Sequence, residues 1–128
     1  MVPDSAWGDY ADAREGVMPD KLYPIRLNPF DPEADMLYCR IVHDRGVLEH
    51  FSIQYQAVIG DADYPIVRYD TSHGTPHRHV LDRFGQTVRK DFFSGRPFKQ
   101  ALNDAQADLK ANWRRYRAEF IEREGLSP

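Results

Sequence analysis

The chain has 128 residues, a net charge of −3 and 41% hydrophobic residues, which suits one soluble globular domain with one core. Its uncharged apolar runs are shorter than a membrane span, and its first residues lack the basic and apolar regions of a signal peptide. The single cysteine, Cys39, excludes a disulfide within the chain. We therefore expect a cytoplasmic protein with no membrane contact, in which Cys39 is a buried, inert thiol.

The charge is distributed unevenly along the chain. Residues 1–63 hold 5 basic and 12 acidic side chains, and residues 64–128 hold 12 basic and 8 acidic ones. The second half therefore suits a phosphate-bearing partner. The whole chain is too acidic for a general nucleic-acid binder, so charge favours a local anionic site at most.

Residues 1–35 form the first distinct segment. They contain five of the nine prolines and eight acidic residues, which predicts an irregular acidic arm. A short helical turn is expected near Ser5–Arg14 and a short strand near Lys21–Leu27. We place the domain proper at residues 36–128.

Three strands are expected after this arm. Residues 36–43 alternate between apolar and polar side chains, residues 47–59 alternate more strictly, and residues 64–71 continue the pattern. The segments 44–46 and 60–63 supply the turns between them. In the central strand one face carries Phe51, Ile53, Tyr55, Ala57 and Ile59, and the other carries His50, Ser52, Gln54 and Gln56.

The C-terminal segment predicts a long amphipathic helix. Its apolar residues recur every three or four positions, between Pro97 at the start and Gly125 at the end. The stripe consists of Phe98, Leu102, Ala105, Leu109, Trp113, Tyr116 and Phe120. We expect it to cover the apolar face of the strands, which gives an α+β fold: an antiparallel β-meander of three to five strands with the helix packed on one face.

Three of the five histidines lie between residues 73 and 79, directly after the third expected strand. His77 and His79 are two positions apart, so on an extended chain they share one side. Histidine has the ordinary side-chain pKa closest to neutrality, and a pair of them can act as general acid and general base on an RNA phosphodiester. The 2′-hydroxyl would be the nucleophile, and neither a metal nor a cofactor is needed.

Neighbouring residues supply the other roles in this hypothesis. Asp70 or His73 would orient an imidazole, and arginines would stabilise the charge on the phosphorane. The candidate catalytic residues are therefore His77, His79, His73 and Asp70, and the candidate substrate-binding residues are Arg78, Arg68, Arg83 and Tyr69.

Two other interpretations use the same residues. A metal ion could be bound by His73, His77, His79 and Asp70, although no glutamate follows the His-x-His pair as it does in cupins. Alternatively, the segment 70–74 is a turn in which Asp70 bonds backbone amides and Gly74 takes a positive φ. The chain would then be a non-catalytic protein-binding module.

The segments "YDTSHGTPHRH", "LDRFGQTVRKDF" and "FKQALNDAQADLKANWRRY" together resemble an uncharacterised archaeal and actinobacterial family. Its members carry an Asp-x-x-His-Gly segment, a His-x-His pair and a closing helix with a tryptophan. The layout is also similar to the TumE-like toxins of toxin–antitoxin modules, which have Asn where this chain has Thr71. The resemblance covers residues 36–120.

This resemblance implies a small toxin that acts on RNA and is inhibited by a partner antitoxin. The partners to test are therefore an antitoxin protein, an RNA substrate and a second copy of the chain.

Overall fold

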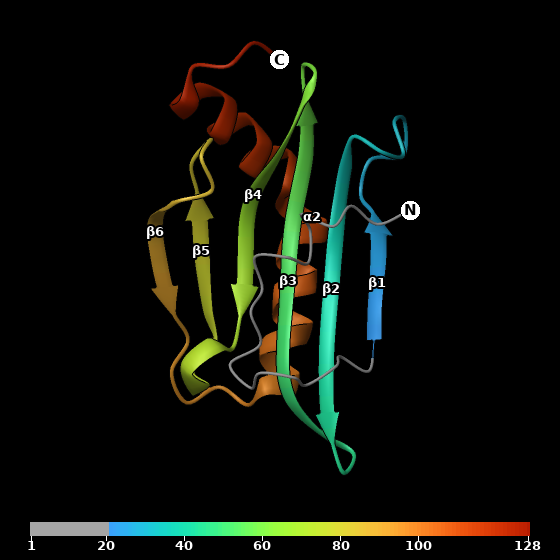
Figure 1. Cartoon of the computed structure of the whole chain (residues 1–128), viewed down its shortest axis with the longest axis vertical. Coiled ribbons are helices and arrows are strands. Elements are labelled where there is room, and N and C mark those ends of the chain that lie inside the picture. The colour runs from blue at the N-terminus through green and yellow to red at the C-terminus, as the bar shows by residue number, and fades with distance from the viewer. Residues whose placement is uncertain (1–20) are drawn as a thin grey trace.

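The structure, a computed structural model, describes residues 21–128. Six strands form one antiparallel sheet in which neighbours along the chain are also neighbours in space, and one long helix lies across a face of that sheet (Figure 1). The elements are β1 (Lys21–Arg26), β2 (Asp35–Asp44), β3 (Val47–Ile59), β4 (Ala62–Asp70), the 3₁₀ turn η1 (Ser72–Gly74), β5 (His77–Leu81), β6 (Thr87–Phe92) and α2 (Phe98–Glu124).

The alternation in β3 separates the two faces of the sheet as expected. All five predicted apolar residues of β3 belong to the core, which also takes Leu37, Cys39 and Ile41 from β2. Burial raises the pKa of the Cys39 thiol to about 11, as expected for an inert thiol. β-Branched and aromatic side chains at every second position form the surface on which the helix packs.

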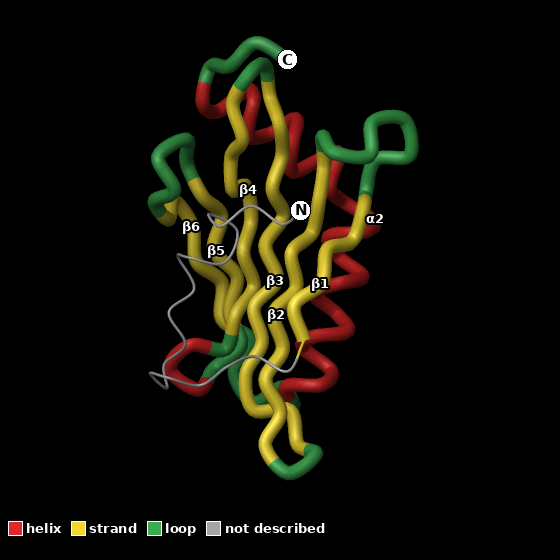
Figure 2. The backbone as a smooth tube through the Cα atoms, turned by 45° about the vertical axis from the view of Figure 1, so that its right-hand side comes forward, coloured by secondary structure: helices red, strands yellow, loops and turns green. Residues whose placement is uncertain are grey.

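The helix α2 contributes a stripe of buried residues to this core. The last five residues of the predicted stripe are buried, namely Ala105, Leu109, Trp113, Tyr116 and Phe120. Phe98 and Leu102 were also predicted in the stripe but are only partly buried, and Ala101 is the buried residue of the first turn. Gly125 ends the helix with φ of 65°, a left-handed conformation that glycine adopts without strain. Figure 2 shows the helix along one side of the sheet only.

The face of the sheet away from α2 is here called the polar face. In β3 it carries His50, Ser52, Gln54 and Gln56, all of which are buried. Because these polar groups are buried, they need hydrogen-bond partners. Gln54 donates to Gln56 at 2.9 Å, and His50 Nδ1 lies 2.8 Å from Thr71 Oγ1.

The α+β class and the helix-covered meander are confirmed, but the predicted number of strands was too low. The hairpin of β5 and β6 was not counted as two strands. The strand β6 is only six residues long and largely exposed, so it gives no alternating apolar signal. The short strand expected near Lys21–Leu27 is β1, and it pairs with β2 along its whole length.

The described part of the sheet begins before residue 36. Residues 21–35 were expected in the acidic arm, yet they contain β1 and the first residue of β2. The helical turn expected near Ser5–Arg14 lies outside the described residues. Within residues 21–128 no helix combines the length and apolar character that crossing a membrane requires.

Candidate functional site

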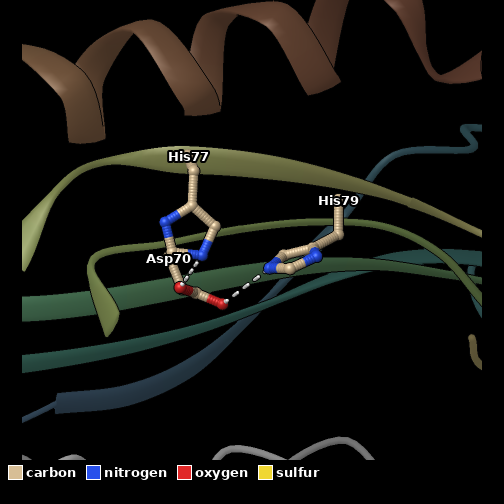
Figure 3. A group of neighbouring side chains, drawn as sticks. All are labelled: Asp70, His77 and His79. Carbon is tan, nitrogen blue, oxygen red and sulfur yellow. Dashed lines mark ion pairs between the residues drawn. The ribbon is translucent and has the colours of Figure 1, made fainter. Parts of the chain in front are cut away.

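The candidate site lies on the polar face, where β4 and β5 pair. The register places Asp70 opposite His77 and Arg68 opposite His79. Because side chains two positions apart share a face, this register brings all four to the polar face as a block. Figure 3 shows the two imidazoles and the Asp70 carboxylate turned toward one another, on the side of the sheet away from α2.

Asp70 and His77 form the closest pair of this block. His77 Nε2 lies 2.7 Å from Asp70 Oδ1, and His77 Nδ1 lies 2.7 Å from the carbonyl oxygen of Thr75. Both partners are acceptors, and they lie on opposite sides of the ring. His77 is therefore held in place between a carboxylate and a carbonyl group.

The environment keeps Asp70 ionised. Burial alone would raise its pKa, but the hydrogen bond and charge of His77, the Ser72 amide and the Arg68 guanidinium outweigh burial and lower the pKa to about 2. Arg68 Nε lies 3.3 Å from Asp70 Oδ2, and the Ser72 amide donates to Asp70 Oδ1 at 3.0 Å. Asp70 is therefore a fixed negative charge between His77 and the Arg68 guanidinium.

His79 differs from His77 in its hydrogen bonding. Its Nδ1 lies 2.9 Å from Thr87 Oγ1, while its Nε2 lies 3.8 Å from Asp70 Oδ2, too far for a hydrogen bond. Burial, followed by the nearby charge of Arg68, lowers the pKa of His79 to about 4. His79 is thus a neutral imidazole whose Nε2 faces the cluster.

The strand β6 adds a cation and an aromatic ring to this face. The register places Lys90 opposite His79 and Phe92 opposite His77. The Lys90 ammonium lies 5.0 Å from the centre of the Phe92 ring, which itself lies 5.8 Å from the His77 ring. The surroundings of the cluster are therefore basic.

Two predicted substrate-binding residues lie on the opposite face. Arg78 and Tyr69 point toward α2, because each lies one position away from the residues of the cluster. Arg78 contacts Asp91 at 2.6 Å and donates to the hydroxyl of Tyr116 at 2.9 Å. Neither Arg78 nor Tyr69 reaches the cluster, although both were expected to bind the phosphate.

The hydroxyls of Tyr69 and Tyr116 complete a network with Asp108 of α2. They donate to Asp108 Oδ2 at 2.6 Å and 2.5 Å, and Arg78 Nη1 lies 3.7 Å from the same oxygen. Burial, followed by the hydrogen bond to Asp108, raises the pKa of Tyr69. We call Tyr69, Arg78, Asp91, Asp108 and Tyr116 the helix-side network.

Two further predicted residues lie outside the cluster. His73 is exposed in η1 with φ of 65°, and it is not among the three residues whose potential metal-binding atoms converge. Arg83 lies in the turn after β5, where its backbone amide and its guanidinium bond Glu124 at the end of α2. The structure therefore brings together Asp70, His77, His79 and Arg68.

Sequence reasoning missed four residues that shape the site: Thr75, Thr87, Lys90 and Phe92. The turn of the β5–β6 hairpin is signalled by Asp82 and Gly85, and Asp82 Oδ1 indeed accepts the amides of Phe84 and Gln86. Pairing the two strands across that turn places Lys90 and Phe92 on the histidine face. The hydrogen bonds of Thr75 and Thr87 to the imidazoles have no signal in the sequence.

The cluster offers three kinds of chemistry within a few ångströms. His79 Nε2 is placed to take a proton, Arg68 supplies positive charge, and Asp70 and His77 hold the cluster in position. Side-chain exposure is 3% for His77, 7% for Asp70, 12% for His79 and 18% for Arg68. A bound molecule would therefore meet His79 and Arg68 first.

Comparisons with known proteins add a family but no activity. Neither the curated proteins nor the solved structures gave a significant match to this chain. One family model, described as a domain of unknown function (DUF7718), matches residues 18–126 and so spans all six strands, the candidate site and the whole of α2. The chain therefore belongs to the DUF7718 family.

Proposed function

We propose that the polar-face cluster cleaves RNA by acid–base chemistry without a metal ion, as the resemblance to TumE-like toxins implies. The observation that carries this proposal is the convergence of His79, His77 and Asp70 beside Arg68 on one face. These residues combine a proton acceptor with positive charge, which is what transfer of a phosphodiester requires. An antitoxin protein is the partner that the same resemblance implies.

The geometry suggests a division of labour within the cluster. His79 Nε2 would remove the proton of the ribose 2′-hydroxyl, and Arg68 would contact the phosphate. The 2′-oxygen then forms a bond to phosphorus, the bond from phosphorus to the 5′-oxygen breaks, and the 5′-oxygen takes a proton from the solvent. The products are a 2′,3′-cyclic phosphate and a free 5′-hydroxyl.

His77 has a different role from the one expected of a second proton-transfer group. Both of its ring nitrogens already face acceptors, so neither is open to a substrate proton. His77 would therefore help Asp70 to hold the cluster in position. Asp70 acts through His77 and Arg68 and is a positioning residue.

The test is cleavage of a short labelled RNA by the full chain in the presence of EDTA. We expect His79→Ala to slow cleavage by about 100-fold or more, because a general base contributes 10²–10⁴. His73→Asn is the matched control, since His73 is exposed and asparagine tolerates its positive φ. An RNA with a 2′-deoxyribose at the cleaved position should not be cleaved, because it lacks the hydroxyl nucleophile.

Three results would contradict the proposal. The first is a wild-type chain that binds RNA or protein without cleaving, which would favour the non-catalytic module. The second is equal cleavage by wild type and His79→Ala, which would indicate a contaminating nuclease. The third is cleavage of the 2′-deoxy substrate, which would exclude the 2′-hydroxyl as the nucleophile.

A further inference from the structure

The same cluster has the donor set of a transition-metal site. One nitrogen each from His77 and His79 and one carboxylate oxygen of Asp70 all lie within 4.8 Å of one another. We propose that these three residues bind one zinc ion, and that bound zinc inhibits the proposed RNA cleavage. The inhibition rests on the proposed function, whereas the binding does not.

The outer contacts of both histidines support this assignment. His77 Nδ1 lies 2.7 Å from the carbonyl oxygen of Thr75, and His79 Nδ1 lies 2.9 Å from Thr87 Oγ1. A histidine that binds a metal usually donates its other N–H to a carbonyl, carboxylate or water, which fixes the ring and turns the remaining nitrogen to the ion. In both histidines that remaining nitrogen is Nε2, and both Nε2 atoms face Asp70 (Figure 3).

The distances within the cluster also fit a zinc ion. Bonds of 2.0–2.2 Å at tetrahedral angles place two zinc ligands about 3.4 Å apart. The separations between the Asp70 oxygens and the two Nε2 atoms are 2.7 Å and 3.8 Å, on either side of this value. One donor atom from each of the three residues lies within 4.8 Å of the others, so the donors would move closer together around the ion.

The donor types select the class of metal. Two imidazoles and one carboxylate suit zinc and its neighbours, whereas magnesium and calcium prefer oxygen ligands alone. Three protein ligands leave a fourth position for water, as in zinc sites that are not purely structural. The cluster is also nearly closed to solvent, and an ion needs less room than an RNA strand.

Arg68 is the residue that opposes this ion. Its guanidinium already pairs with Asp70 Oδ2 at 3.3 Å, so a metal must share that carboxylate with a cation. Removing the charge with Arg68→Gln should therefore tighten zinc binding. The same change should slow RNA cleavage, because Arg68 is the proposed phosphate contact, so the two readouts should move in opposite directions.

Zinc binding is tested on untagged full-length chain freed of metal with a chelator. We expect calorimetry to give one zinc ion per chain, and the melting temperature to rise by roughly 10 °C at a zinc concentration of about 100 times the Kd. Magnesium chloride is the control ion and should give neither effect. Cobalt(II) in place of zinc should give the intense visible absorption of a tetrahedral site.

Variants link this binding to the cluster. His79→Ala and His77→Gln should each abolish the stoichiometric binding, while His73→Asn should keep it. Circular dichroism shows whether each variant is folded, and Asp70→Asn provides a third ligand change should one of the histidine variants fail to fold. Binding retained in folded His79→Ala, or lost in His73→Asn, would overturn the site.

Activity separates the two proposals. Zinc binding by a chain that never cleaves RNA supports the metal site and overturns the proposed function. Cleavage of RNA in EDTA by a chain that binds no zinc supports the proposed function and overturns the metal site. Cleavage that one equivalent of zinc stops, and that EDTA restores, is the result we expect.

Discussion

The two faces of the β4–β5 pair carry two polar clusters made from neighbouring residues. On the side of α2, Tyr69 and Arg78 enter the helix-side network, in which hydroxyl, guanidinium and carboxylate groups bond one another. On the polar face, Asp70 and His79 belong to a cluster in which one imidazole nitrogen lies 3.8 Å from its nearest carboxylate. The groups of the first cluster bond one another, whereas the second keeps one imidazole nitrogen, Nε2 of His79, beyond hydrogen-bond distance of Asp70.

We therefore assign stability to the helix-side network and chemistry to the polar-face cluster. The helix-side network joins β4, β5 and β6 to α2, so its loss should loosen the contact between helix and sheet. The polar-face cluster joins only adjacent strands that are already paired. We therefore expect changes in the first to affect folding and changes in the second to affect activity.

The largest effect on stability is expected from Asp108→Asn. Asparagine removes the charge that accepts both tyrosine hydroxyls, and we expect the free energy of unfolding to fall by about 2 kcal/mol. Asp104→Asn on the same helix is the matched control, because its carboxylate is 49% exposed and paired with the exposed Arg96. It should cost less than about 0.5 kcal/mol in urea denaturation. Equal costs would contradict the structural role of the network.

The two arginines provide a second comparison. Arg68→Gln should slow RNA cleavage by about 10-fold, as loss of one charged phosphate contact does. Arg78→Gln should leave the rate of cleavage within about 3-fold and instead lower the free energy of unfolding by about 1–2 kcal/mol. The assay is run at a temperature at which both variants are folded. A larger loss of cleavage in Arg78→Gln would reverse our assignment of the two faces.

The smallest expected effect is one of pH on stability. Burial alone would raise the pKa of Asp108, but hydrogen bonds from Tyr116, Tyr69 and Asn112 and the charge of Arg78 lower it below its ordinary value. The stability from this depressed pKa is therefore complete above the ordinary value of about 3.9 and is lost as the pH falls through the folded-state pKa. The stability difference between wild type and Asp108→Asn should be constant above about pH 5 and shrink below about pH 4. A difference that grows in acid would contradict this sign.

The periodicity of the sequence was sufficient for the central strand and the helix. The alternation of β3 and the three- and four-residue spacing in α2 follow directly from burial of one face. The apolar residues of β3 were predicted one by one, whereas the stripe of α2 was predicted correctly only from Ala105 onward. The strand β6 was missed because four of its six residues are polar and most are exposed. The turn at Gly85, by contrast, has a clear local signal.

The sequence predicted the residue types of the candidate site better than it predicted their arrangement in space. His77 and His79 share a face because strands repeat every two residues, and Asp70 joins them because the β4–β5 hairpin pairs it with His77. The same rule places Arg78 on the opposite face, although its position between two histidines suggested a phosphate contact. The sequence could not exclude His73 from the candidate site. The direction of a side chain in a turn depends on the backbone φ of that residue, which the sequence does not give.

The most direct test compares the same substitution on the two faces. Asp70→Asn and Asp108→Asn each replace a carboxylate by an amide of equal size, one in the polar-face cluster and one in the helix-side network. In single-turnover RNA cleavage with EDTA, at a temperature at which both variants are folded, we expect Asp70→Asn to be slower than wild type by at least about 100-fold. We expect Asp108→Asn to stay within about 3-fold of wild type, because its carboxylate lies on the far face from the cluster. Equal rates in the two variants, or a slower Asp108→Asn, would contradict the assignment of chemistry to the polar face.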